Sequence, residues 1–165
     1  MNAVFHPPID SYFLNSGEML FSTEACIVKT ILGSCVGVAL HDPYLRIGGL
    51  CHYLLPEASG QIPSTKYGDT ALPLLLSRFH RAGSEKKQLR AWIIGGALLL
   101  EAHEIFFVGD RNADFAEKFL GDLGVRVVHN ETRGFRGRKV TFHTGHGHVR
   151  IEIIPSRALK DLVII

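Results

Sequence analysis

The sequence is poor in the features that mark secreted, membrane-spanning or disulfide-rich proteins. Only three of its 165 residues are cysteine, and their irregular spacing indicates reduced thiols in the cytoplasm rather than a disulfide framework. The longest apolar run, Ala91–Leu100, is interrupted by two glycines and is far shorter than the ~20 residues that a bilayer requires. Met1–Asn15 has no basic start followed by an apolar core, so no secretory signal is predicted.

The chain also lacks a strong charge of either sign. Its 18 Lys+Arg and 16 Asp+Glu leave a net charge of +2, too small to predict binding to nucleic acid or direct insertion into an anionic membrane. Hydrophobic residues make up 46% and charged residues 21%, which is typical of a folded globular domain and excludes a disordered chain. The length corresponds to one domain.

The order of apolar runs and turn signals predicts a single mixed α/β domain. Residues 1–22 are expected to be an irregular segment that precedes one domain over residues 23–165. Two helices are predicted, from Asp69 to Gly83 and from Asn112 to Gly124, each with apolar residues on one side. Short apolar runs bounded by glycine and proline predict strands at Ala25–Val28, Val36–Leu40, Ile47–Leu55, Ala91–Ile94, Ile105–Val108, Val125–Val128, Lys139–His143 and Val149–Ile154.

A cysteine at a glycine-containing turn is the first candidate for chemistry. Cys35 follows Gly33 and Ser34 and precedes a predicted strand, and such a turn can direct backbone N–H groups to one point, as an oxyanion hole requires. His52 lies on the next strand, where antiparallel pairing would bring it to the same end of the sheet. A nearby imidazolium would favour the reactive thiolate. The structural alternative is that Cys35 only fills the core.

Other candidate residues give weaker signals. Cys26 and Cys51 lie in apolar runs and are predicted to be structural. Gly95 and Gly96 are expected to allow close backbone packing beside the reactive turn, since the sequence around them lacks a nucleotide-binding pattern. The basic run 133–139 is expected to be a solvated loop, with an anionic partner as its alternative.

Three histidines near the C-terminal end raise a different possibility. His146 and His148 would share one face of a strand and, with His143, would offer ligands for zinc. No cysteine pair or metalloprotease motif accompanies them, and exposed histidines at a glycine-rich hairpin are the alternative. A zinc-dependent hydrolase therefore stays open as a secondary hypothesis.

Taken in order, several segments resemble the chemoreceptor glutamine deamidase family, CheD, over about residues 23–153. The segments that carry the resemblance are Leu32-Gly33-Ser34-Cys35-Val36-Gly37-Val38, Asp42-Pro43, Ile47-Gly48-Gly49-Leu50-Cys51-His52-Tyr53-Leu54-Leu55-Pro56, Tyr67-Gly68-Asp69, Gly95-Gly96-Ala97, Gly109-Asp110-Arg111-Asn112-Ala113, Gly137-Arg138-Lys139-Val140 and Gly147-His148-Val149. Arg133 and Phe135 depart from it, because they occupy a segment that is usually richer in glycine.

The resemblance implies an enzyme, a protein-glutamine glutaminase that acts in chemotaxis. Cys35 matches the family nucleophile, His52 its general base and Thr30 its third active-site residue, with the oxyanion turn at Gly33 and Ser34. The implied fold has two packed mixed sheets with helices on the outer faces, in α/β/β/α layers. No cofactor is implied, and the implied partners are the cytoplasmic helical region of methyl-accepting chemotaxis receptors and a CheC-type phosphatase. A mainly non-catalytic adaptor is the alternative from another functional class.

Overall fold

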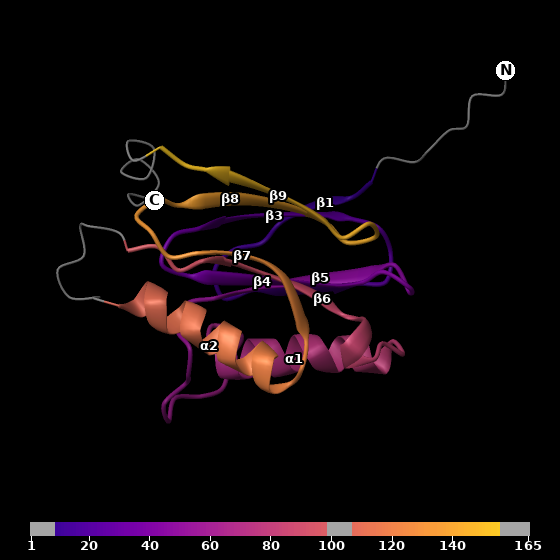
Figure 1. The fold of residues 1–165 in the computed structure, drawn as a ribbon, viewed down its shortest axis with the longest axis horizontal. Coiled ribbons are helices and arrows are strands. Elements are labelled where there is room, and N and C mark those ends of the chain that lie inside the picture. The colour runs from indigo at the N-terminus through magenta and orange to yellow at the C-terminus, as the bar shows by residue number, and fades with distance from the viewer. Residues whose placement is uncertain (1–8, 99–106, 156–165) are drawn as a thin grey trace, which may run out of the picture.

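Two β-sheets and a pair of helices form three stacked layers in the computed structural model, which describes residues 9–98 and 107–155 (Figure 1). One sheet has the strand order β1-β3-β8-β9, and the other has the order β2-β5-β4-β6-β7. The strands are β1 (Ser11–Phe13), β2 (Met19–Ser22), β3 (Ile27–Leu32), β4 (Val36–Asp42), β5 (Ile47–Tyr53), β6 (Arg90–Gly95), β7 (Arg126–Thr132), β8 (Arg138–His143) and β9 (His148–Ile153). The helices are α1 (Gly68–Arg81), the 3-10 helix η1 (Lys86–Gln88) and α2 (Val108–Asp122).

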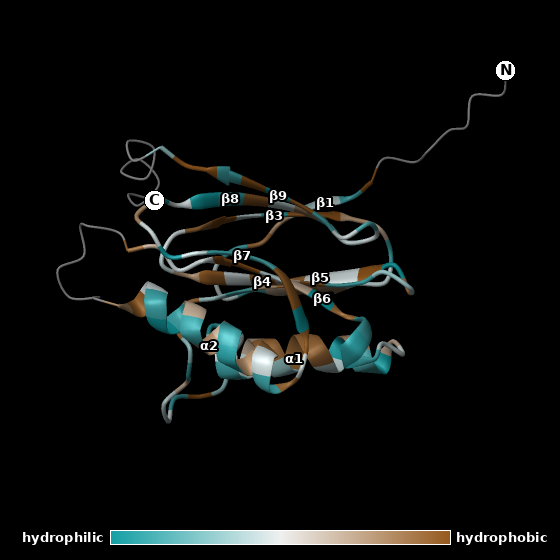
Figure 2. Ribbon diagram, viewed as in Figure 1, coloured by the Kyte–Doolittle hydropathy of each residue, from teal (hydrophilic) through white to brown (hydrophobic). Residues whose placement is uncertain are grey.

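The two central strands of the five-stranded sheet are buried along their whole length. Every residue of β4 and β5 is buried, because the helices cover one face of this sheet and the second sheet covers the other. Alternate residues of β4 divide between the two interfaces: Val36, Val38 and Leu40 pack with the helices, whereas Ala39 packs toward the four-stranded sheet. Figure 2 shows hydrophobic stretches on β3, β4 and β6 and a hydrophilic side on α2.

The helices differ from expectation in how they begin. α1 starts at Gly68, one residue before the predicted start at Asp69, with Tyr67 as the N-cap residue. Asp69 Oδ2 does not cap the helix and accepts a hydrogen bond from the N–H of Ala58, at 3.1 Å. Pro73 consequently lies in the second turn of the helix. α2 starts at Val108, four residues earlier than predicted. The predicted strand over 105–108 is wrong at positions 107 and 108, and its first two positions lie outside the described residues.

The expected single α/β domain with two packed mixed sheets is confirmed. Within the described ranges, both α-helices lie on the outer face of the five-stranded sheet, and the four-stranded sheet carries no helix on its outer face (Figure 1). The segment 1–22 is not irregular throughout, since it contributes β1 and β2. These strands are only three and four residues long and pair with β3 and β5, so a local pattern could not reveal them.

Candidate active site

The turn between β3 and β4, residues 33–35, is held by hydrogen bonds to its carbonyl groups. The carbonyls of residues 33 and 35 accept from the backbone N–H groups of Ala97 and Gly96, at 2.9 and 2.8 Å. The carbonyl of Ser34 accepts from Asn112 Nδ2 on α2, at 3.0 Å. The N–H groups of Ser34 and Cys35 donate to no oxygen atom of the described residues, so they are available to a developing oxyanion.

The glycine pair at the end of β6, Gly95 and Gly96, permits this arrangement, as the sequence predicts. Gly95 has a φ of 110°, which is favourable only for glycine, and a Cβ atom at this position would collide with the carbonyl of Cys35. A Cβ atom on Gly96 would meet the carbonyl of Gly109, which lies in the first turn of α2. Both glycines therefore bring three backbone segments together beside the cysteine.

His52 is oriented by a buried threonine hydroxyl. Thr30 Oγ1 lies 2.8 Å from His52 Nδ1 and 2.7 Å from the carbonyl oxygen of Leu14. The hydroxyl has one hydrogen, which it donates to Leu14, so it must accept its second bond from Nδ1–H of the imidazole. This fixes the tautomer of neutral His52, with the lone pair on Nε2.

The lone pair of His52 lies on the same side of the sheet as Cys35. His52 pairs with Gly37, two residues after the cysteine, and reaches Thr30 in the facing sheet. Cys35 packs against Leu32 and its neighbours between the same two sheets. Nε2 is buried and has no hydrogen-bond partner among the described residues, so the thiol is not hydrogen-bonded to it in this structure. The Nε2 lone pair is therefore not engaged by any described residue.

Burial keeps both groups neutral in the resting site. It raises the pKa of Cys35 to about 11, although the residue's own backbone N–H acts in the opposite direction. Desolvation lowers the pKa of His52 to about 4, partly offset by the negative charge of Glu18. Both pKa shifts oppose a thiolate–imidazolium pair in the resting site, and the roles expected for Cys35 and His52 stay a prediction.

The histidine cluster has a different structure from a metal site. The rings of His143 and His146 lie with their centroids 4.5 Å apart and their planes tilted by 33°, and His143 Nδ1 accepts the backbone N–H of His146 at 3.2 Å. Arg46 lies 3.4 Å from His146 Nδ1, which places a cation next to the cluster. The described parts of the chain contain no group of three or more His, Cys, Asp or Glu arranged to hold a metal ion.

The basic run 133–139 is only partly the solvated loop that was expected. Arg133 is bound by three carboxylates of α2, and Arg138 is almost fully buried and lies 3.3 Å from Glu131. Cys26 and Cys51 are buried in apolar clusters, which agrees with their predicted structural role. A groove of about 700 Å³ beside α1 and η1 lies at the opposite end of the molecule from Cys35.

Comparison with known proteins places this chain in a family. A family model described as CheD chemotactic sensory transduction matches residues 54–153. A probable chemoreceptor glutamine deamidase CheD of Archaeoglobus fulgidus is 39% identical over 133 residues, which cover 78% of this chain and 85% of that protein. The chain belongs to the CheD family. Probable chemoreceptor glutamine deamidases CheD 1 of Anaeromyxobacter dehalogenans and Burkholderia thailandensis are 36% and 35% identical, and the matches cover 80% and 60% of their lengths.

Sequence reasoning missed three residues that support the candidate site. Leu14 accepts the hydrogen bond of the Thr30 hydroxyl, and the carbonyl of Glu18 accepts the backbone N–H of His52 at 3.0 Å, yet both lie in the segment expected to be irregular. Asn112 is completely buried on α2. The sequence feature that could have identified Asn112 is a polar residue one helical turn before the buried Ala116, on the face of α2 that packs against the sheet.

Proposed function

We propose that this chain is a protein-glutamine deamidase that converts glutamine side chains of chemoreceptors to glutamate. The observation that carries the proposal is the hydrogen-bond chain from Leu14 through Thr30 to His52, which leaves an unpartnered nitrogen lone pair on the side of the sheet where Cys35 lies. A thiol, a fixed base and two free backbone N–H groups are the parts that amide hydrolysis through a thioester requires.

Acylation starts from neutral groups. As the thiol approaches Nε2, His52 accepts the Cys35 proton while Sγ forms a bond to the carboxamide carbon of a glutamine. The N–H groups of Ser34 and Cys35 stabilise the oxyanion. His52 then donates the proton to the leaving nitrogen, the C–N bond breaks, and ammonia departs from a thioester on Cys35.

Hydrolysis of the thioester reverses the proton transfers. His52 Nε2 removes a proton from water, whose oxygen forms a bond to the thioester carbon. The C–S bond breaks, Cys35 regains its proton from His52, and a glutamate side chain remains. Thr30 keeps Nδ1 protonated throughout, which orients the imidazole and stabilises its cationic form. No cofactor enters these steps.

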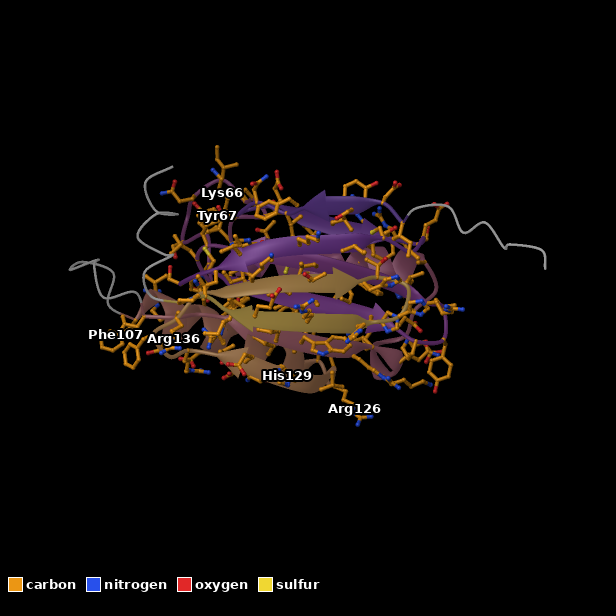
Figure 3. All side chains as sticks on the ribbon, turned by 90° about the horizontal axis from the view of Figure 1, so that it is seen from above. Lys66, Tyr67, Phe107, Arg126, His129 and Arg136 are labelled. Atoms are coloured by element: carbon orange, nitrogen blue, oxygen red, sulfur yellow. The ribbon has the colours of Figure 1, made fainter. Side chains whose placement is uncertain are left out.

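A protein substrate must dock around this end of the molecule. Phe107 and Phe135 are 63% and 64% exposed there, and Lys66, Arg111 and Arg136 are exposed and make no ion pair with the described residues. Figure 3 shows Phe107, Arg136 and Lys66 at one end. We call these five residues the docking rim; it suits a surface that presents apolar and acidic side chains.

The proposed partners are the cytoplasmic helical regions of methyl-accepting chemotaxis receptors, and a CheC-type phosphatase that competes with them for the same rim. The proposed location is therefore the cytoplasm. In the described ranges, no helix is long and apolar enough to cross a membrane.

Ammonia release from a purified receptor cytoplasmic fragment tests the proposal. The protein should release ammonia in proportion to the glutamate formed, and Cys35→Ala and His52→Gln should abolish the release. Receptor binding with no ammonia release would support the adaptor alternative instead. Loss of activity after treatment with a chelator, with Cys35→Ala still active, would favour the zinc-hydrolase alternative.

A further inference from the structure

Asn112 connects the two segments that carry the nucleophile and the base. Its side-chain nitrogen donates both hydrogens, one to the carbonyl of Ser34 at 3.0 Å and one to the carbonyl of Leu54 at 2.8 Å. Ser34 directly precedes Cys35, and Leu54 lies two residues after His52. The two carbonyl acceptors define the orientation of the amide group, because the reverse orientation would place Oδ1 against two oxygens.

The backbone of Asn112 is fixed as well. The hydroxyl of Tyr53 donates to its carbonyl group, and the residue is completely buried on α2. Asn112 Oδ1 is buried with no hydrogen-bond partner among the described residues, a cost that the two donated bonds must offset. A leucine of similar size would avoid this cost, so the amide is not explained by packing alone.

Peptide geometry transmits this contact to the reaction centre. The carbonyl of Ser34 and the N–H of Cys35 belong to one planar trans peptide unit and point in opposite directions. When Asn112 holds the carbonyl toward α2, the N–H of Cys35 must point away from the helix. The preceding peptide unit is fixed in the same way, because the N–H of Ala97 holds the carbonyl of Gly33.

We propose that Asn112 is a positioning residue that sets the oxyanion hole by fixing the Ser34–Cys35 peptide plane. The inference deepens the proposed function, on which it rests for the identity of the natural substrate. It assigns to α2 a role in acyl transfer that neither the cysteine nor the histidine can supply. Loss of the amide should impair formation of the tetrahedral intermediate and spare reactions of Cys35 that form no oxyanion.

Two reagents separate these effects without a receptor. p-Nitrophenyl acetate transfers its acetyl group to Cys35 through an oxyanion and releases p-nitrophenol, whereas iodoacetamide alkylates the thiol by displacement of iodide. Both rates should be measured at one pH for the wild type, Asn112→Asp and Asn112→Ala, after subtraction of the Cys35→Ala background. Asn130→Ala is the matched control, since Asn130 also donates to α2, at Glu117, but does not contact the turn.

The expected result is a loss of acylation rate of roughly 10- to 100-fold in both Asn112 variants, with alkylation within about twofold of the wild type. Receptor deamidation should then show a lower kcat at unchanged KM. Unchanged acylation, or equal loss of acylation and alkylation, would overturn the inference. A wild type that is acylated normally but does not deamidate receptors would contradict the proposed function and leave the role of Asn112 intact.

Discussion

At the scale of single residues, the site depends on a histidine kept neutral by burial and given one tautomer by a threonine. His52 is 4% exposed, and Thr30 is completely buried beneath it. The thiol gains no resting charge from its neighbour, because the pKa of Cys35 is raised and that of His52 is lowered. We therefore expect proton transfer to accompany attack on the substrate rather than to precede it.

The hydroxyl of Thr30 should be required for turnover. In Thr30→Val, the shape is retained, but the carbonyl of Leu14 and Nδ1 of His52 lose their partner. We expect kcat to fall at least about tenfold, because the tautomer is no longer fixed. The free energy of unfolding should fall by about 1–3 kcal/mol. Thr30→Ser keeps the hydroxyl and should recover most of both losses, as steady-state kinetics and denaturant unfolding would reveal; equal defects in the two variants would contradict this role.

The depressed pKa of His52 predicts acid sensitivity of the fold. Because the pKa of His52 is about 4 in the folded protein and the ordinary pKa of histidine is 6.5, the unfolded chain binds the proton more readily between these pH values. Stability should accordingly fall as the pH drops from 6.5 to 4, by roughly 3 kcal/mol from this group. Urea unfolding over this range should show a flatter dependence for His52→Gln. His41 and His143, whose pKa values are also lowered, contribute in the same direction, and an identical slope in the variant would assign the effect to them.

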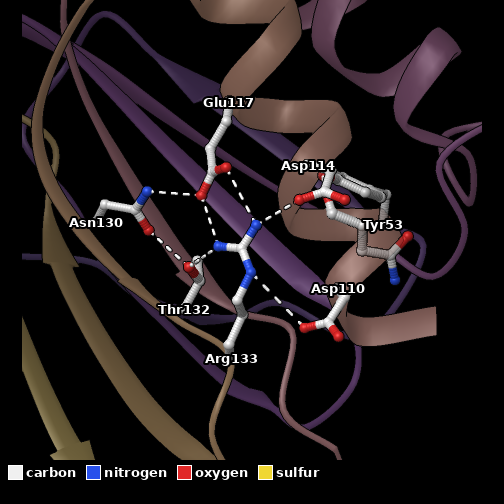
Figure 4. A network of polar contacts seen from close by, with 8 residues as sticks. Tyr53, Asp110, Asp114, Glu117, Asn130, Thr132 and Arg133 are labelled. Atoms are coloured by element: carbon white, nitrogen blue, oxygen red, sulfur yellow. Dashed lines mark hydrogen bonds and ion pairs between the residues drawn. The ribbon is translucent and has the colours of Figure 1, made fainter. Parts of the chain in front are cut away.

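At the scale of the elements, α2 is attached to the end of β7 by the ion pairs of Arg133 and by a hydrogen bond from Asn130 to Glu117 (Figure 4). The guanidinium of Arg133 contacts Asp110, Asp114 and Glu117, which lie along one side of the helix. The backbone of Arg133 has a φ of 71°, and its N–H donates to the carbonyl of Gly95 at 2.8 Å. Arg133 thus occupies a conformation that favours glycine, and the three carboxylates offset the strain.

Two substitutions separate the strain from the ion pairs. Arg133→Ala removes the charge and keeps the left-handed backbone of a non-glycine residue, so we expect a loss of about 1–2 kcal/mol in unfolding free energy. Arg133→Gly removes the same charge but relieves the backbone, so it should be about 1 kcal/mol more stable than the alanine variant. High salt should destabilise the wild type more than either variant in denaturant titrations. Equal stability of the two variants would show that the backbone is not strained.

The strands and helices also show how much of the fold could be predicted from the sequence. The strands β4, β5, β6 and β8 were predicted from short apolar runs. Their residues are apolar because packing of the two sheets and the helices buries them, which makes these strands recognisable in the sequence. The start of α2 was missed because its N-cap residue, Phe107, has no side-chain capping bond, and its first residues do not show the apolar period.

The candidate site, too, could be predicted only in part from the sequence. Cys35 and His52 were accessible from local motifs, whereas Thr30 came from the family resemblance alone, and the structure places Thr30 against His52. The contacts of Leu14 and Asn112 depend on segments 16 and 78 residues away from their partners Thr30 and Ser34. No local pattern encodes such contacts. The neutral resting state also depends on burial, which only the packed sheets produce.

At the scale of the whole molecule, we propose that one end carries both the chemistry and the docking rim. Figure 3 shows Lys66 and Arg136 at that end and Arg126, an exposed cation of β7, away from it. The rim cations Lys66, Arg111 and Arg136 form no ion pair with the described residues. A rim of this sign should accelerate association with an acidic helical surface, and the effect should weaken with added salt.

Charge reversal of the rim should affect docking and spare the chemistry. Replacement of Lys66, Arg111 and Arg136 together by Glu should lower kcat/KM for a receptor fragment by roughly tenfold at low ionic strength, mainly through KM. Acylation by p-nitrophenyl acetate should remain unchanged, because this reagent needs no docking surface. Arg126→Glu is the control and should behave as the wild type. An equal loss of rate in receptor deamidation and in acylation would show that the cations stabilise the fold rather than recognise the receptor.

The most direct test of the central claim is mass spectrometry of a receptor cytoplasmic fragment after incubation with the protein. We expect the wild-type protein to replace NH2 by OH at particular glutamine side chains. The Cys35→Ala and His52→Gln variants should leave those glutamines unchanged. Unmodified glutamines in the wild-type reaction, or conversion that persists in Cys35→Ala, would contradict a deamidase that uses this cysteine.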